Sequence, residues 1–167
     1  SPRELIPRRP DLGPTRDLED RAPTKDLSAD EGFQRPRDDE GSNMYEIEIQ
    51  DEFSAAHFLK LYDGTWERRH GHNWKVSVVV RSEKLDSMGV VVDFEALKPS
   101  LRTVLSDFNE RLFNDHPDFK DGKLNPSTEN IARIIYERLS KNFRSENARI
   151  VKVTVWETPQ ANASFYE

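Results

Sequence analysis

The stretch HGHNWKVSVVVRSE, residues 70–83, has the hydrophobic alternation of a β-strand. From Asn73 to Glu83, apolar and polar residues follow one another with the period of two that is typical of a half-buried strand. Residues i and i+2 of a strand point to the same face, so His70 and His72 can present two imidazoles to one point in space. Two histidines alone are more often a solvated surface feature than a metal site. A metal site therefore needs a further ligand from elsewhere in the chain.

The segment MYEIEIQDEFSAAHF, residues 44–58, alternates in the same way and ends close to a third histidine, His57. Turn signals separate it from residues 70–83, which predicts an antiparallel pair. Because His57 lies 13 residues before His70, a hairpin could bring three imidazoles together. Three imidazoles with one open position are the usual composition of a catalytic zinc site. The alternative is that His57 packs under the sheet while the other two histidines are exposed.

Two segments change to helical spacing. The first, DFEALKPSLRTVLSDFNERLF at 93–113, has Asp93 as a plausible N-cap, and Pro99 lies early enough to be accommodated in or near the first turn. The second, NPSTENIARIIYERLSKNF at 125–143, can be capped by Ser127 or Thr128. The fourth histidine, His116, falls in the NDHPDF loop between them and is interpreted as a turn residue rather than a ligand.

The C-terminal segment ARIVKVTVWET, residues 148–158, alternates again, and NASFYE at 162–167 can add a last strand or hairpin arm. The element order is therefore β-β-α-α-β-β. Strands grouped at the two ends of the chain predict an α+β fold, in which an antiparallel sheet carries the helices on one face.

Composition and net charge indicate how the chain divides into a tail and a domain, and which classes of partner it does not suit. Residues 1–43 are rich in proline and mixed charge and cannot bury enough apolar surface to offset the entropy of ordering, so we expect a disordered tail before one domain at 44–167. The alternative is a partner-binding segment. A net charge of −6 argues against nucleic acid or an anionic membrane as partner.

The sequence also lacks two features, cysteine residues and long apolar segments, and each lack excludes a class of site or of location. The chain has no cysteine, which excludes disulfides, thiolate zinc sites and thiol nucleophiles. No stretch approaches about 18 consecutive apolar residues and no signal peptide is evident, so we expect a soluble, cytoplasmic protein.

Four motifs in a fixed order, FSAAH, HGHNW, NPSTENIA and VWET, resemble those of the 6-pyruvoyltetrahydropterin synthase and 6-carboxytetrahydropterin synthase family. The resemblance covers residues 44–167. It implies a tunnelling fold, in which a four-stranded antiparallel sheet with two helices trimerises into a barrel and stacks into a hexamer. It also implies Zn²⁺ on His57, His70 and His72, and a dihydroneopterin triphosphate-type substrate bound between subunits.

The resemblance also assigns substrate-binding residues. Glu157 of the VWET motif matches the carboxylate that anchors the pterin ring, and a carboxylate does offer two acceptors to the paired N–H donors of a 2-amino-4-oxo heterocycle. The alternative for Glu157 is an exposed glutamate at a strand end. Thr128 and Glu129 match positions that line the pterin pocket at a helix start, where ordinary helix capping is the alternative.

The chain departs from the family pattern at the proton-transfer residues. Most members have a cysteine four residues before HGH, where this chain has Trp66. A subgroup that cleaves the side chain to leave 6-hydroxymethyl-dihydropterin has a glutamate three residues before HGH, and Glu67 matches it. A carboxylate can act as a general base if burial raises its pKa. The alternative for Glu67 is a solvated loop charge.

The family's Asp-His pair is replaced as well, because Asn109 and Glu110 stand in that register. The sequence therefore predicts a zinc-dependent carbon–oxygen or carbon–carbon lyase that acts on a pterin side chain, with Glu67 and Glu110 handling protons. The alternative is a zinc- and pterin-binding paralogue that has lost turnover.

Overall fold

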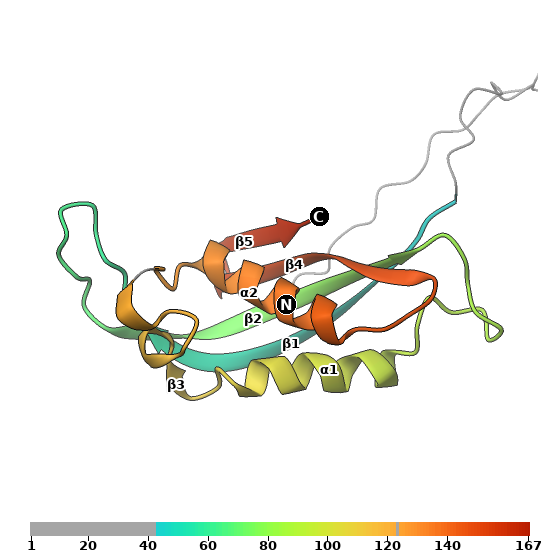
Figure 1. Cartoon of the computed structure of the whole chain (residues 1–167), viewed down its shortest axis with the longest axis horizontal. Helices are drawn as coiled ribbons and strands as arrows, with labels where there is room; N and C mark the ends of the chain where they lie inside the picture. The colour runs from blue at the N-terminus through green and yellow to red at the C-terminus, as the bar shows by residue number, and fades with distance from the viewer. Residues whose placement is uncertain (1–42, 123) are drawn as a thin grey trace, which may run out of the picture. The chain divides into compact units, whose positions relative to one another are not determined.

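The computed structural model describes residues 43–122 and 124–167, so the tail predicted at residues 1–43 lies, except for its last residue, outside the described part of the chain. The elements and their bounds (Figure 1) are β1 Tyr45–His57, β2 His70–Ser82, α1 Phe94–Ser106, β3 Arg111–Leu112, the 3₁₀ turns η1 Phe113–Asp115 and η2 Lys120–Gly122, α2 Thr128–Asn142, β4 Ala148–Thr158 and β5 Ala161–Tyr166.

The sheet has the strand order β3-β1-β2-β4-β5. β1 and β2 form a long antiparallel hairpin whose register runs from Tyr45 opposite Ser82 to His57 opposite His70. β4 pairs antiparallel with β2, and β5 pairs antiparallel with β4. The four predicted antiparallel strands are thus confirmed, including the last strand in the segment NASFYE.

A fifth strand is a correction to the predicted sheet. β3 pairs parallel to β1 at Ala55 and Ala56, in a region where the sequence pattern continued the first helix. α1 ends at Ser106 because the chain then turns back to β1. Asn109 Oδ1 accepts a hydrogen bond from the backbone N–H of Ser54, and the N–H of Glu110 donates to the Ser54 carbonyl at 2.6 Å. Glu110 has a φ of 58°, a left-handed conformation that no helix continues through.

The helix starts follow local capping chemistry. Asp93 accepts from the N–H of Glu95 and caps α1, as predicted. Ser127, and not Thr128, caps α2 by accepting from the N–H of Asn130. Pro99 lies inside α1, just beyond the first turn and therefore near it, as predicted.

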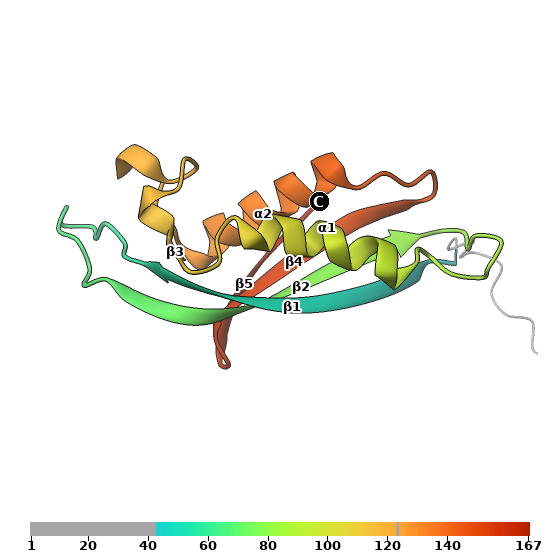
Figure 2. The same ribbon diagram turned by 90° about the horizontal axis from the view of Figure 1, so that it is seen from below.

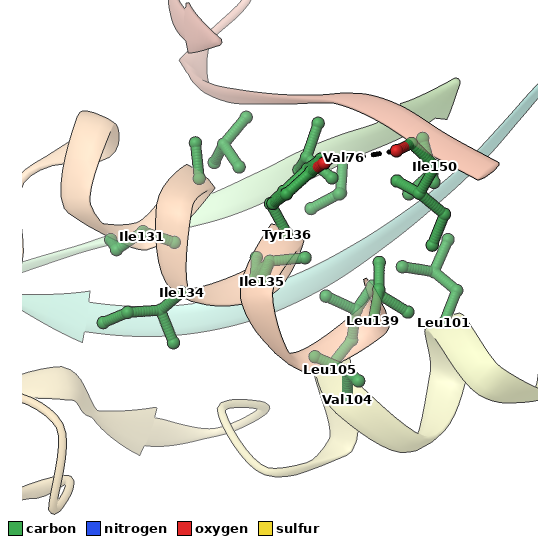
Figure 3. Packing of buried hydrophobic residues seen from close by; sticks show 14 of the residues in the cluster. Val76, Leu101, Val104, Leu105, Ile131, Ile134, Ile135, Tyr136, Leu139 and Ile150 are labelled. Carbon is green, nitrogen blue, oxygen red and sulfur yellow. Dashed lines mark hydrogen bonds between the residues drawn. The ribbon is translucent and has the colours of Figure 1, made fainter. Parts of the chain in front are cut away.

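Both helices cover the same face of the sheet (Figure 2), α1 over β1 and α2 over β4 and β5. The core fills the space between these layers (Figure 3), with Ile135 and Leu139 of α2 completely buried and the hydroxyl of Tyr136 donating to the carbonyl of Ile150. Burying each such aliphatic side chain stabilises the fold by about 1.5–3 kcal/mol. No helix in the described ranges is long and apolar enough to span a membrane.

On the face of β2 that the helices cover, the row of buried apolar side chains is followed by two histidines. Val80, Val78, Val76 and Trp74 are each 0% exposed and alternate along the strand on the face that the helices cover. The same period of two places His72 and then His70 next in this row. The apolar core therefore gives way to a cluster of imidazoles at this end of the sheet.

Candidate metal centre

The register of the β1–β2 hairpin gathers the three histidines. His57 pairs with His70, and His72 pairs with Ala55, two residues further along each strand of the hairpin. The Nε2 atoms of His57 and His70 are 3.0 Å apart. The ring of His72 has its centroid 5.3 Å from that of His57 and 5.0 Å from that of His70. His57 is buried, His70 is exposed and His72 is half-buried, so the burial expected in the alternative is largely found, but the three rings lie together.

Backbone carbonyls fix the direction of two of these rings. His57 Nδ1 lies 2.8 Å from the carbonyl oxygen of Pro126, just before α2, and His70 Nδ1 lies 2.8 Å from that of Arg68. A carbonyl can only accept, so each Nδ1 carries the proton and each neutral ring keeps a lone pair on Nε2. Two lone pairs that face each other at 3.0 Å repel, whereas a cation between them would bind both. This arrangement is the one that metal-ligating histidines adopt.

Glu157, near the end of β4, joins the cluster. Its Oε1 lies 3.1 Å from His72 Nε2 and 3.4 Å from His57 Nε2, and its side chain is 29% exposed. His72 Nε2 is buried and makes no hydrogen bond of good geometry with a described residue, although Glu157 is close. The ligand atoms of the three histidines and Glu157 all lie within 4.8 Å of one another. Three imidazole nitrogens and one carboxylate oxygen form a donor set that can hold a divalent metal ion.

Burial favours the ligating form of His72. Desolvation lowers the pKa of this imidazole, and the neighbouring His57 and His70 lower it further, while the Glu157 carboxylate opposes the shift. His72 is therefore neutral at neutral pH. Neutral imidazole is the form that coordinates metals.

The start of α2 contributes Thr128 to the same site. Its side chain is buried, and its hydroxyl donates to Glu157 Oε2 at 2.6 Å. The capping alternative for Thr128 is thus wrong, since Ser127 makes the cap. Glu129, the next residue, is exposed and lies outside the cluster.

Glu67 lies in the loop that joins His57 to His70, outside the four-residue cluster. Its backbone N–H donates to the carbonyl of Leu59, and its Oε2 accepts from the N–H of Leu59 at 3.1 Å. The side chain is half-buried, so the alternative of a fully solvated loop charge does not describe it. These two bonds tie the backbone and the carboxylate of Glu67 to Leu59, two residues after His57.

Glu110 is exposed and is not brought among the imidazoles of its own chain. It lines a shallow hollow of about 430 Å³ that also contains His72, Arg69 and Arg111. The position of Glu110 is set by its left-handed backbone and by the bond of its N–H to Ser54.

Three groups that shape this site were not predicted from the sequence: two backbone carbonyls and the ring of Trp74. The carbonyls of Pro126 and Arg68 orient two rings, but any residue has a carbonyl. Trp74 forms the floor, with its ring centroid 5.0 Å from that of His57 and 5.3 Å from that of His72. The period-two alternation from Trp74 to His72 could have identified this contact.

Comparison with known proteins identifies the family of this chain. Residues 46–167 match the family model described as 6-pyruvoyl tetrahydropterin synthase. The 6-carboxy-5,6,7,8-tetrahydropterin synthase of Bacillus subtilis is 35% identical over 120 residues, which are 69% of this chain and 80% of that protein. The dihydroneopterin monophosphate aldolase of Pyrococcus furiosus is 36% identical over 105 residues, which are 63% of this chain and 82% of that protein.

A solved structure supports the same conclusion for the fold. The structure of 6-pyruvoyl tetrahydropterin synthase from Caenorhabditis elegans superposes with a TM-score of 0.64 at 25% identity, covering 75% of this chain and 96% of that one. The tunnelling fold implied by the sequence motifs is thus confirmed for the single chain. Because the family model matches residues 46–167, nearly all of the described part of the chain, the chain belongs to the 6-pyruvoyl tetrahydropterin synthase family.

Proposed function

We propose that this protein is a zinc-dependent lyase that acts on the side chain of a dihydroneopterin triphosphate-type pterin. The observation that carries the proposal is the convergence of the Nε2 atoms of His57 and His70, each ring oriented through Nδ1 by a backbone carbonyl, beside half-buried His72, whose Nε2 atom is buried. The names of two relatives support the substrate class, since one is a tetrahydropterin synthase and the other a dihydroneopterin monophosphate aldolase.

In this proposal His57, His70 and His72 hold the zinc ion. When bound, zinc acts as a Lewis acid that lowers the pKa of hydroxyl groups on the substrate side chain. In their neutral form His57 and His70 offer the Nε2 lone pair to the metal, because their carbonyl partners keep the ring proton on Nδ1. Trp74 closes one side of the cluster and excludes water there.

Glu157 is proposed to anchor the pterin ring. Its carboxylate can accept from two adjacent N–H donors, a charge-assisted and bidentate contact. Thr128 positions this carboxylate through its hydroxyl. Glu129, an exposed residue in the first turn of the same helix, is proposed as a further contact to the substrate beside the free backbone N–H groups there.

Glu67 is proposed to move the proton on the side-chain carbon. The loop that carries it spans two zinc ligands, and the Leu59 N–H holds one of its oxygens, so the carboxylate has a defined position rather than a mobile one. Glu110 is the second candidate for proton transfer because it shares a hollow with His72.

A second reaction, cleavage of the side chain to leave 6-hydroxymethyl-dihydropterin, is favoured by two observations. The chain contains no cysteine, so the thiol base of most family members is absent and Glu67 stands nearby instead. The aldolase of Pyrococcus furiosus is as similar to this chain as the synthase of Bacillus subtilis.

Product analysis separates these reactions. The zinc-reconstituted full chain is incubated with dihydroneopterin triphosphate and, in parallel, with dihydroneopterin monophosphate, and the products are identified by mass spectrometry. A product that keeps the side-chain carbons supports the synthase reaction, and 6-hydroxymethyl-dihydropterin supports cleavage. No product from either compound, with pterin binding retained, contradicts the lyase proposal and favours a binding protein.

We also propose that the subunits assemble into a trimer or hexamer. Within the described residues, β3 pairs with β1 only at Ala55 and Ala56, so the outer edge of β1 from Tyr45 to Ser54 has no partner strand in its own chain. A long unpaired edge favours pairing with a second copy, and closed symmetry satisfies every edge. Light scattering at micromolar concentration tests this, and a monomeric mass would contradict it.

A further inference from the structure

We propose that Asn114 and Asn125 are positioning residues for Glu67. Their side-chain amides hold residues 58–60 on one edge, and the carboxylate of Glu67 is hydrogen-bonded to the opposite edge of the same segment. This inference rests on the proposed function, in which Glu67 transfers a proton, and it extends that function to two residues that lie outside the histidine cluster.

Each asparagine makes two hydrogen bonds with the backbone of one residue. Asn114 Oδ1 accepts from the N–H of Phe58 at 3.1 Å, and Asn114 Nδ2 donates to the Phe58 carbonyl at 2.8 Å. Asn125 repeats this arrangement at Lys60, with distances of 2.8 Å and 2.9 Å. A side-chain amide has a donor and an acceptor side by side, as a peptide group has. Each asparagine therefore satisfies the backbone of its partner as a neighbouring strand would.

Glu67 binds the residue between these two. The N–H of Leu59 donates to Glu67 Oε2 at 3.1 Å, and the N–H of Glu67 donates to the Leu59 carbonyl at 2.9 Å. Successive residues of an extended chain point their backbone groups to opposite edges, so the asparagines and Glu67 hold residues 58–60 from two sides. The bond to Leu59 uses one carboxylate oxygen and leaves Oε1 for proton transfer.

Asn125 connects this segment to the start of α2. Its carbonyl accepts from Nδ2 of Asn130, a residue in the first turn of that helix, at 2.9 Å. Residues 58–60 follow His57 directly, so the same contacts set the position of the Glu67 carboxylate relative to a proposed zinc ligand. Loss of the asparagine amide would leave one edge of the segment without its partner and let the carboxylate shift. A shift of about 1 Å in a reacting group can lower a rate by about 100-fold.

Amide hydrogen exchange tests these contacts without any turnover. The exchange rate of the Leu59 amide is measured by mass spectrometry at single-residue resolution, on the zinc-reconstituted full chain. Asn114→Ala and Asn125→Ala should each raise this rate by about 10-fold or more, although neither asparagine contacts the Leu59 N–H, because each change removes two bonds that hold the segment. Asn147→Ala, the same change at an exposed position between α2 and β4, should match the wild type. Unchanged exchange at Leu59 in both variants would overturn the proposal.

Turnover tests whether the asparagines act through Glu67. We expect Asn125→Ala to lower kcat by about 10- to 100-fold, while zinc content and neopterin affinity stay near those of the wild type. In the Glu67→Gln protein, adding Asn125→Ala should lower kcat by less than about 2-fold, because the group that the asparagine positions is already gone. Asn125→Asp keeps the acceptor and the volume of the side chain, and it replaces the alanine variant if that protein does not fold.

Three results separate this proposal from its alternatives. A loss of kcat that adds in full to that of Glu67→Gln would overturn it, because the asparagine would then act on the fold in general. Loss of zinc from Asn125→Ala would overturn it as well, since the effect would lie at the metal site. If the wild type forms no product but exchange at Leu59 responds as expected, the positioning of the carboxylate is supported and the proposed proton transfer fails.

Discussion

Thr128 Oγ1 and Glu157 Oε2 are 2.6 Å apart, and the hydrogen bond between them joins the first turn of α2 to the end of β4. The two residues are separated by 29 positions in the chain. The contact sets the carboxylate beside His57 and His72, so the helix start and the hairpin end form one site. A short O–H···O⁻ bond of this kind is charge-assisted and stronger than a neutral one.

Replacing Glu157 by glutamine should weaken pterin binding. The amide places a donor where the carboxylate has its second acceptor, so one donor of the pterin would face another donor. We expect a loss of about 2–4 kcal/mol in binding free energy, the range for breaking a charge-assisted contact that is shielded from water. Calorimetric titration with neopterin measures this. Equal affinity in Glu157→Gln and the wild type would remove the pterin assignment and leave a metal-binding protein of unknown ligand.

Removing one imidazole should empty the metal site. We expect about one zinc per chain in the reconstituted wild type and far less in His70→Ala, because a zinc site needs all three of its protein nitrogens. His116→Ala is the matched control, since this histidine packs on Phe108 and lies outside the cluster. Elemental analysis after desalting gives the metal content. A His70→Ala protein that retains all its zinc contradicts the assignment.

Local periodicity in the sequence indicates part of the histidine cluster, but it does not indicate the contact between Thr128 and Glu157. A period of two fixes which side chains of one strand share a face, so His70 and His72 could be placed together from spacing, whereas the position of His57 depends on the register of the hairpin and was assigned by the family resemblance. The contact of Thr128 with Glu157 joins a helix to a strand through tertiary packing, and no local pattern encodes it.

The missed strand has a similar cause. β3 is two residues long, too short for any periodicity, and the apolar residues Phe108 and Leu112 continue the helical spacing beyond the observed end of α1. The turn depends on two hydrogen bonds with Ser54, more than 50 positions away: the Ser54 N–H donates to Asn109 Oδ1, and the Ser54 carbonyl accepts from the N–H of Glu110. A correct sheet of four strands was therefore predicted without its fifth member.

The left-handed turn at Glu110 predicts a gain in stability on substitution by glycine. An L-residue in this conformation lowers the stability by roughly 1–2 kcal/mol, and glycine removes this strain. Glycine also makes the unfolded chain more flexible, which cancels about 0.5–1 kcal/mol of that gain. We expect Glu110→Gly to raise the free energy of unfolding by about 0.5–1 kcal/mol in urea titration. Glu110→Ala keeps the Cβ atom and should not show this gain. If Glu110 also transfers protons, both variants lose turnover alike, because both lack the carboxylate. Turnover then reports the role of the side chain, and the difference in stability between the variants reports the backbone strain. A glycine variant less stable than the wild type would show that the turn is not strained.

Glu67→Gln should separate chemistry from binding. The glutamine oxygen can still accept from the Leu59 N–H, so the loop between His57 and His70 should keep its conformation, and neopterin affinity and zinc content should stay near those of the wild type. Loss of the ionisable group should lower turnover by about 10²-fold or more, the usual contribution of a general base. Product formation at saturating dihydroneopterin triphosphate measures the rate, and calorimetry measures the affinity. Glu52→Gln, the same change at an exposed position of β1, should leave both values unaltered. Full turnover in Glu67→Gln would show that the base lies elsewhere, and Glu110 would then be the next residue to replace.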